Sequence, residues 1–116
     1  DMASITSYYK FEQELKFFEG WVSGVSVITK DNGSYFCKFS IPLKKDEKDE
    51  PLWLNCSIFD TALCDKFTSE CKKGSRILVG GYFTTSTTSE GAEFINFNVK
   101  MYEFYGQARQ KREAVG

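Results

Sequence analysis

The chain has 116 residues, 41% of them hydrophobic and 16% aromatic, which suits one folded domain with a modest core. It contains no histidine, so a Ser-His-Asp centre and any histidine-containing metal site are excluded. The formal net charge of −1 lacks the basic excess that most nucleic-acid-binding proteins carry.

The first part of the chain contains a predicted β-hairpin behind a short extension. Residues 1–17 form an N-terminal extension with helix-like spacing of its apolar residues, although its end fits the start of a strand equally well. Residues 18–30 alternate as in a strand that glycines interrupt, and Asn32-Gly33 is typical of a tight turn. We therefore expect residues 18–43 to form a hairpin.

The next two strand patterns separate a core face from an outer face. Residues 35–43 and 52–59 alternate, and the charged run at 44–50 between them contains no apolar residue, so we expect it to be an exposed loop. The predicted core-facing residues are Tyr35, Cys37, Phe39, Ile41 and Leu43 in the first strand and Leu52, Leu54, Cys56 and Ile58 in the second.

A short helix and two strands complete the predicted elements. Asp60 is expected to cap a helix that ends in basic residues and Gly74. A strand at 76–83, a polar turn-rich segment at 84–91 and a long strand at 94–104 follow. Residues 105–116 are expected to be a flexible tail. Alternation in the last strand places on one face Ile95, Phe97, Val99 and Met101.

Three strands, a helix and two further strands are therefore the predicted order of elements. This order matches the OB-fold, a five-stranded Greek-key barrel whose helix lies between the third and fourth strands. The predicted fold class is all-β with one short helix, in a single domain over residues 18–104.

The four cysteines, at positions 37, 56, 64 and 71, are expected to be buried, reduced thiols. The sequence contains no Cys-x-x-Cys pair, and no histidine could complete a mixed zinc site. Reduced thiols are typical of a reducing compartment, so the predicted location is cytoplasmic.

Trp53 and Phe59 are the residues that indicate a function most directly. The core face of their strand is complete without them, so both rings project from the opposite face, about 20 Å apart by strand geometry. Rings so placed fit stacking of separate nucleic-acid bases. They could equally cover the helix, a second core or a subunit interface. Phe36 and Lys38 share the outer face of the neighbouring strand, whereas the pattern leaves Trp21 either buried or exposed.

The run from Trp53 to Phe59 and the later run from Lys73 to Gly81 resemble the bacterial single-stranded DNA-binding protein family. In that family a Trp is followed six residues later by a Phe, and a helix then ends in Lys-Gly-Ser or Lys-Gly-Asp, as here. The resemblance covers about residues 18–104 and implies that both rings stack on bases. It also implies that two loops contact DNA, at residues 44–50 and 84–92.

Several positions depart from the family pattern. Asn55 and Thr61 stand where the family often has basic residues, and the segment at 84–91 contains neither Trp nor Arg. The family's long acidic-tipped tail is also missing, which fits either a shortened chain or a divergent version from a plasmid, phage or other mobile element. Fewer phosphate contacts predict weaker binding with a shallower salt dependence than is typical of the family.

The sequence thus predicts a non-catalytic, sequence-tolerant single-stranded DNA-binding protein that supports DNA replication, recombination or repair. It has no nucleotide-binding glycine loop and no nucleophile elbow, so no catalytic residue, metal ion or cofactor is expected. A homodimer or homotetramer without membrane contact is the expected state. The alternatives are an OB-fold protein-interaction subunit of a replication or recombination complex and a single-stranded RNA binder. The candidate nucleic-acid-binding residues are Trp53, Phe59, Phe36, Lys38, Trp21, Lys73, Arg76 and Lys100.

Overall fold

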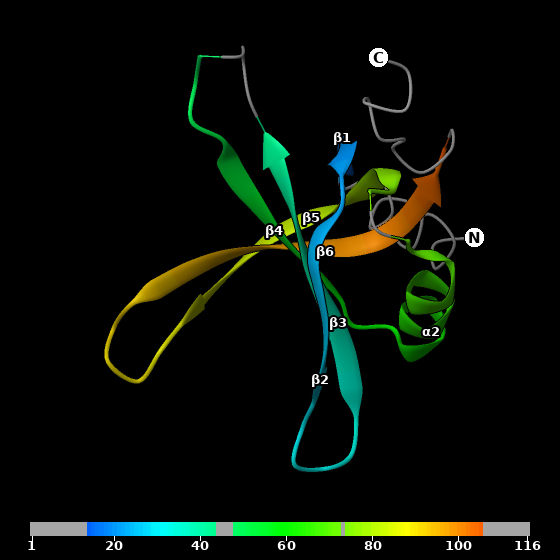
Figure 1. The fold of residues 1–116 in the computed structure, drawn as a ribbon. Helices are drawn as coiled ribbons and strands as arrows, with labels where there is room; N and C mark the ends of the chain where they lie inside the picture. Colours follow the sequence, from blue (N-terminus) through cyan, green and yellow to red (C-terminus); the bar gives the residue numbers. More distant parts are fainter. Residues whose placement is uncertain (1–13, 44–47, 73, 106–116) are drawn as a thin grey trace, which may run out of the picture.

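The computed structural model describes residues 14–43, 48–72 and 74–105. They form a curled sheet of six strands with a helix packed against it (Figure 1). Across the sheet the strand order is β1-β5-β6-β4-β3-β2, in which β4 and β6 run parallel and the other neighbours antiparallel. The elements are β1 (Lys16–Trp21), β2 (Ser23–Thr29), β3 (Tyr35–Leu43), β4 (Leu52–Ile58), α2 (Thr61–Glu70), β5 (Arg76–Thr87) and β6 (Glu93–Phe104).

The chain crosses from one edge of the sheet to the other at Val22, between β1 and β2. β1 pairs with β5, whereas β2 pairs with β3 at the opposite edge, so consecutive strands close the curled sheet into a barrel. The N–H of Val22 donates to the carbonyl of Ser75, 2.9 Å away, at this crossing. The prediction of one strand over residues 18–30 is therefore wrong, because the barrel requires two edge pairings from that segment.

The described strands run from Lys16 to Phe104. β1 begins at Lys16, so the end of the predicted extension is strand rather than helix. The hydroxyl of Tyr105 donates to Glu19 of β1, which joins Tyr105 to the barrel as well. The remainder of the predicted extension, residues 1–13, and of the predicted tail, residues 106–116, lies outside the described residues.

The predicted turn and core of the first hairpin are confirmed. Gly33 has φ +89°, a left-handed conformation that suits glycine, and the N–H of Lys30 donates to the Ser34 carbonyl at 2.7 Å. Alternation in β3 and β4 fills the barrel as expected, except that Leu52 at the start of β4 is exposed. The fully buried large side chains of the core include Phe39, Ile41, Ile58, Phe67, Ile77, Val79, Phe97 and Val99.

Helix α2 follows β4 and precedes β5 in the chain, and it closes one end of the core. Its N-cap is Asp60, as predicted, and the carboxylate accepts the N–H of Leu63 at 2.9 Å. Phe67 is its main anchor, because that ring stacks on Phe39 at 4.6 Å between centroids. The helix ends at Glu70, before the basic residues that were expected to end it. No helix in the described ranges is long and apolar enough to cross a membrane.

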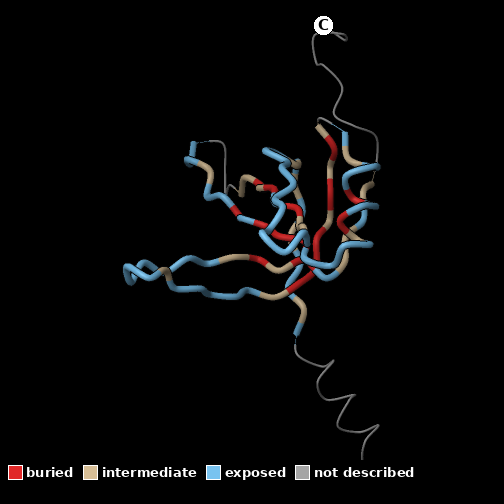
Figure 2. Tube along the Cα trace, turned by 90° about the horizontal axis from the view of Figure 1, so that it is seen from below, coloured by how far each residue is buried: buried red, intermediate tan, exposed pale blue. Residues whose placement is uncertain are grey.

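The hairpin of β5 and β6 is much longer than the sequence pattern indicates. β5 continues to Thr87, past the predicted end at residue 83, because its Thr- and Ser-rich segment pairs with β6 as far as Glu93. The turn is closed by the N–H of Thr88, which donates to the Ala92 carbonyl at 2.8 Å. The hairpin projects from the barrel as an exposed arm (Figures 1 and 2).

A bulge between Gly80 and Gly81 interrupts the pairing of this hairpin. Gly80 pairs with Met101 and Gly81 with Val99, so Lys100 is the extra residue on β6. The extra residue of this β-bulge therefore lies on β6, opposite the step from Gly80 to Gly81 on β5.

The bulge changes which alternate residues of β6 point toward the core. Phe97 and Val99 are buried before the bulge, whereas Tyr102 and Phe104 pack against the core beyond it. The prediction that Met101 shares one face with Phe97 and Val99 is wrong, because the extra residue shifts the alternation by one.

Candidate functional site

The paired outer faces of β3 and β4 carry the predicted aromatic residues. Trp53 is 49% exposed and Phe59 45% exposed, so neither ring belongs to the core. Antiparallel pairing places Pro42 opposite Trp53 and Lys38 opposite Ser57. The two rings thus lie at opposite ends of β4, Trp53 near its start and Phe59 directly after its last residue, Ile58.

One hollow, of about 600 Å³, is lined by both tryptophans. Trp53 contributes from β4 and Trp21 from the end of β1, next to the crossing of the chain. The sequence pattern allowed Trp21 to be either buried or exposed, and the structure shows that it is 39% exposed. Lys72, just beyond α2, lines the same hollow, so a cation lies beside two indole rings.

A second hollow, of about 550 Å³, is lined by phenylalanines. The rings of Phe36 and Phe59 lie against each other, with 4.9 Å between centroids and 35° between planes. Phe94 on the β5–β6 arm lines the same hollow and is 55% exposed. We call the five rings of the two hollows the aromatic track: Trp21, Trp53, Phe36, Phe59 and Phe94.

The two hollows adjoin each other along the outer face. Gly24 of β2 lines both of them, and β3 contributes Pro42 to the first and Ser40 to the second. Among the described residues that line them, the charged side chains are Lys38 and Lys72, and none is a carboxylate. The local charge of the aromatic track is therefore positive although the chain as a whole is slightly acidic.

Lys30 adds a further cation at the phenylalanine end of the aromatic track. Its ammonium nitrogen lies 5.5 Å from the centroid of the Phe36 ring and 6.0 Å from that of Phe59. This geometry is that of a cation–π contact with both rings.

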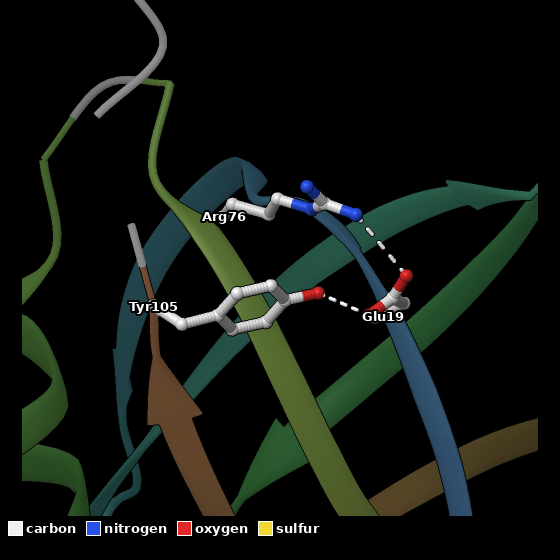
Figure 3. A network of polar contacts seen from close by, with 3 residues as sticks. All are labelled: Glu19, Arg76 and Tyr105. Atoms are coloured by element: carbon white, nitrogen blue, oxygen red, sulfur yellow. Dashed lines mark hydrogen bonds and ion pairs between the residues drawn. The ribbon is translucent and has the colours of Figure 1, made fainter. Parts of the chain in front are cut away.

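Arg76 occupies a polar network beside the first hollow (Figure 3). Its guanidinium donates to Glu19 at 3.1 Å and lies 5.5 Å from the Trp21 ring and 5.0 Å from the Tyr105 ring. The hydrogen bond from Tyr105 and the charge of Arg76 hold the pKa of the Glu19 carboxyl below its usual value. Arg76 thus has an anionic partner, whereas Lys38 and Lys72 form no ion pair with any residue that the structure describes.

Two other predicted phosphate contacts are not part of the aromatic track. Lys100 lines a separate hollow with Lys66 of α2 rather than either hollow of the track. Lys73 lies outside the described residues. The predicted residues that the fold brings together are therefore Trp21 with Trp53, and Phe36 and Lys38 with Phe59.

The cysteines are free thiols, as predicted, and three of the four are buried. Burial raises the pKa of Cys37 and of Cys56 to about 12, so both stay protonated at neutral pH. Cys71 is only half-buried, at the edge of the tryptophan hollow, which corrects the prediction for that residue.

Sequence reasoning missed one ring of the aromatic track, Phe94, and several residues beside the rings. Asn96 lines the phenylalanine hollow, Lys30 lies over two of its rings, and Lys72 lines the tryptophan hollow. Phe94 begins the last strand in the pattern, but nothing local indicates that this arm folds toward β3 and β4. Lys30 precedes a tight turn, where a lysine is ordinarily solvated.

Comparisons with known proteins agree with the geometry. The model of the Single-strand binding protein family matches residues 22–101. A mitochondrial single-stranded DNA binding protein of S. cerevisiae, Rim1, is similar with a TM-score of 0.70 and 14% identity, over 83% of this chain and 97% of that one. An SSB of Plasmodium falciparum, solved in complex with ssDNA, gives a TM-score of 0.67 and 15% identity, over 82% and 96% of the two chains. No curated protein matches the sequence. The likeness to these structures confirms the predicted OB-fold.

Proposed function

The chain belongs to the single-strand binding protein family, and from this premise we propose that it binds single-stranded DNA along the aromatic track. Bases stack on the exposed rings, and lysines beside the rings neutralise phosphates. The protein acts as a non-catalytic coat on single strands, in DNA replication, recombination or repair.

The observation that carries the proposal is the row of rings on one continuous face. The tryptophan hollow and the phenylalanine hollow adjoin at Gly24, and both are open to solvent beside exposed rings. Trp53 and Phe59 are about 20 Å apart by strand geometry, which spans a few extended nucleotides. A π-face accepts any base, so such a row favours a strand of any sequence.

The lysines explain how a slightly acidic chain can bind a polyanion. Lys38 and Lys72 line the aromatic track and Lys30 lies over two of its rings, whereas no carboxylate is among the described lining residues. Binding that releases few counterions has a shallow salt dependence, about 0.7 in log-log slope for each phosphate neutralised on a single strand. Much of the affinity then comes from stacking, which salt screens little.

The test is a titration of fluorescently labelled oligo-dT, with tryptophan emission followed in parallel at low and moderate salt. Trp53→Ala and Phe59→Ala should each weaken binding by about 5- to 150-fold, which corresponds to about 1–3 kcal/mol per stacked base. Phe17→Ala is the matched control, because Phe17 is 53% exposed but lies on β1, away from both hollows. Circular dichroism establishes that each variant is folded.

Absence of micromolar binding at low salt in the wild-type protein would refute the proposal. Equal binding by wild type and by both ring variants would refute the assignment of the aromatic track. Tighter binding of the matching RNA oligomer would favour the RNA-binding alternative. Loss of all nucleic-acid binding would favour a protein-interaction subunit, whose partner then covers the same rings.

We also propose that copies of the chain assemble into a dimer or tetramer. β1 and β2 are the edges of the sheet, and β2 exposes Val25, Val27 and Ile28. An exposed apolar edge strand is suited to pairing with its own copy. Light scattering after gel filtration should give a mass at least twice 13.3 kDa, and a monomer at micromolar concentration would contradict this assembly.

A further inference from the structure

The basic excess that the chain as a whole lacks is present in one short segment, residues 106–116, which we call the basic segment. It contains Arg109, Lys111 and Arg112 against a single acidic residue, Glu113. The whole chain has 15 basic and 16 acidic residues, so 12 basic and 15 acidic residues remain in the rest of it. The positive charge that most nucleic-acid-binding proteins carry is therefore found, in this chain, in the basic segment.

The structure fixes where the basic segment begins, because Tyr105 directly precedes it. The backbone N–H of Tyr105 donates to the Arg76 carbonyl at 3.2 Å, and its hydroxyl donates to Glu19 (Figure 3). Arg76 is the first residue of β5 and pairs with Trp21, the last residue of β1. The basic segment therefore starts from the barrel wall next to Trp21.

This starting point is the tryptophan end of the aromatic track. The guanidinium of Arg76 lies 5.0 Å from the centroid of the Tyr105 ring and 5.5 Å from that of the Trp21 ring, so one side chain contacts both rings. Trp21 lines the tryptophan hollow together with Trp53 and Lys72. A strand of DNA in that hollow would thus lie close to the first residue of the basic segment.

The arginines of the basic segment are within reach of such a strand. A chain spans at most about 3.3–3.6 Å per residue, so the backbone of Arg109 and of Arg112 can lie up to about 13–25 Å from Tyr105. The Glu19 carboxylate, beside the start of the segment, already accepts hydrogen bonds from Tyr105 and Arg76. A single strand, by contrast, offers one phosphate charge for each nucleotide.

We propose that Arg109 and Arg112 bind phosphates of the single strand that occupies the tryptophan hollow. This inference rests on the proposed function, and it adds a source of phosphate contacts beyond the lysines of the aromatic track. Arginine binds a phosphate through paired N–H donors and does not contact the base, so these contacts strengthen binding to every sequence alike. The basic segment thereby supplies positive charge that the composition of the barrel lacks.

The experiment measures the affinity for labelled oligo-dT as a function of salt, in wild type and in a variant that combines Arg109→Gln with Arg112→Gln. Loss of two phosphate contacts should lower affinity by about 5- to 50-fold at low salt and reduce the log-log salt slope by about 1.4, at about 0.7 for each contact. Circular dichroism and urea unfolding establish that the variant is folded. An affinity and a slope equal to those of wild type would overturn the inference.

Lys16→Gln combined with Lys66→Gln is the matched control, because it changes the net charge by the same amount. Lys16 lies at the start of β1 and Lys66 on α2, and neither lines a hollow of the aromatic track. This control variant should bind nearly as tightly as wild type. If it loses as much affinity as the arginine variant, net charge accounts for the effect and the inference is wrong.

Tryptophan emission reports where on the aromatic track the basic segment acts, because the two tryptophans of the chain both line the tryptophan hollow. A short oligo-dT that spans only one hollow should quench this emission at a lower concentration in wild type than in the arginine variant. If the variant binds long oligo-dT more weakly but is quenched by the short oligomer as wild type is, the segment contacts the strand elsewhere and the inference is wrong.

Failure of this inference and failure of the proposed function give different results. If wild type binds oligo-dT, Trp53→Ala weakens that binding and the arginine variant does not, the role of the basic segment is refuted and the proposed function stands. If wild type does not bind oligo-dT at low salt, both are refuted.

Discussion

The bulge at Gly81 gives a stringent test of how the barrel is built. A Cβ atom added at Gly81 would lie 2.0 Å from the backbone oxygen of Asn98, against a lower limit of 3.0 Å for such contacts. The obstacle is backbone of the paired strand and cannot rotate away, so β5 and β6 would have to separate locally by about 1 Å. Gly81→Ala should therefore disturb the pairing that sets the faces of β6.

The expected cost follows from that separation. A shift of about 1 Å breaks one or two ladder hydrogen bonds, at about 1 kcal/mol each, and overpacking contributes about 1–3 kcal/mol more. We expect a loss of about 3 kcal/mol, a large part of the 5–15 kcal/mol typical of a domain. With an m-value of about 1–2 kcal/mol/M in urea, the urea concentration at the unfolding midpoint should fall by about 1.5–3 M.

The assay is urea unfolding followed by tryptophan fluorescence and circular dichroism. Gly91→Ala is the control, because Gly91 has φ +88° at the tip of the arm but nothing within 4 Å of an added Cβ. That variant should lose only about 1 kcal/mol for the left-handed backbone. Equal losses in the free energy of unfolding for the two variants would show that close approach of the strands does not restrict position 81 to glycine.

Three further predictions concern the core, the polar network and the thiols. Phe67→Ala removes a fully buried ring whose centroid lies 4.6 Å from that of Phe39. The free energy of unfolding, measured by thermal unfolding, should fall by about 3–5 kcal/mol. A fall below about 1 kcal/mol would mean that α2 does not need this anchor. Because Glu19 has a lowered pKa, its contribution to stability is present above the ordinary value of 4.5 and is lost as pH falls through the lowered one. The unfolding midpoint of wild type should thus exceed that of Glu19→Gln at pH 7 and converge with it in acid, and a gap that persists at the lowest pH would contradict the role of the carboxylate. In iodoacetamide labelling of the native protein at pH 8, Cys71 should react well before Cys37 and Cys56. The thiols of Cys37 and Cys56 are buried and their pKa is raised to about 12, so few of them are reactive thiolates. Equal labelling rates in mass spectrometry would disprove this order.

The sequence by itself determined the features that depend on neighbours along the chain. Strict alternation placed Trp53 and Phe59 on the face opposite Cys56 and Ile58, because side chains of a strand point to alternate sides. Asp60 was identifiable as a helix cap from its position alone. The same local patterns predicted the order of strands and helix from which the OB-fold was inferred.

Only the tertiary structure decided the features that depend on partners far away in the chain. Val22 divides a segment that reads as one strand, because its two halves pair with opposite edges of the sheet. Barrel closure requires these two pairings, and no local pattern encodes them. The bulge at Gly81 shifts the alternation of β6, since one extra residue on one strand moves every later side chain to the other face.

The same division applies to the aromatic track. Its central rings could be predicted from one strand, but the pairing of Trp21 with Trp53 and the arrival of Phe94 beside Phe59 depend on closure of the barrel. The near-neutral charge of the chain was a property of the whole sequence. The fold separates that charge in space, with lysines along the rings and Glu19 held by Arg76 at the side, because electrostatic attraction depends on distance and not on composition.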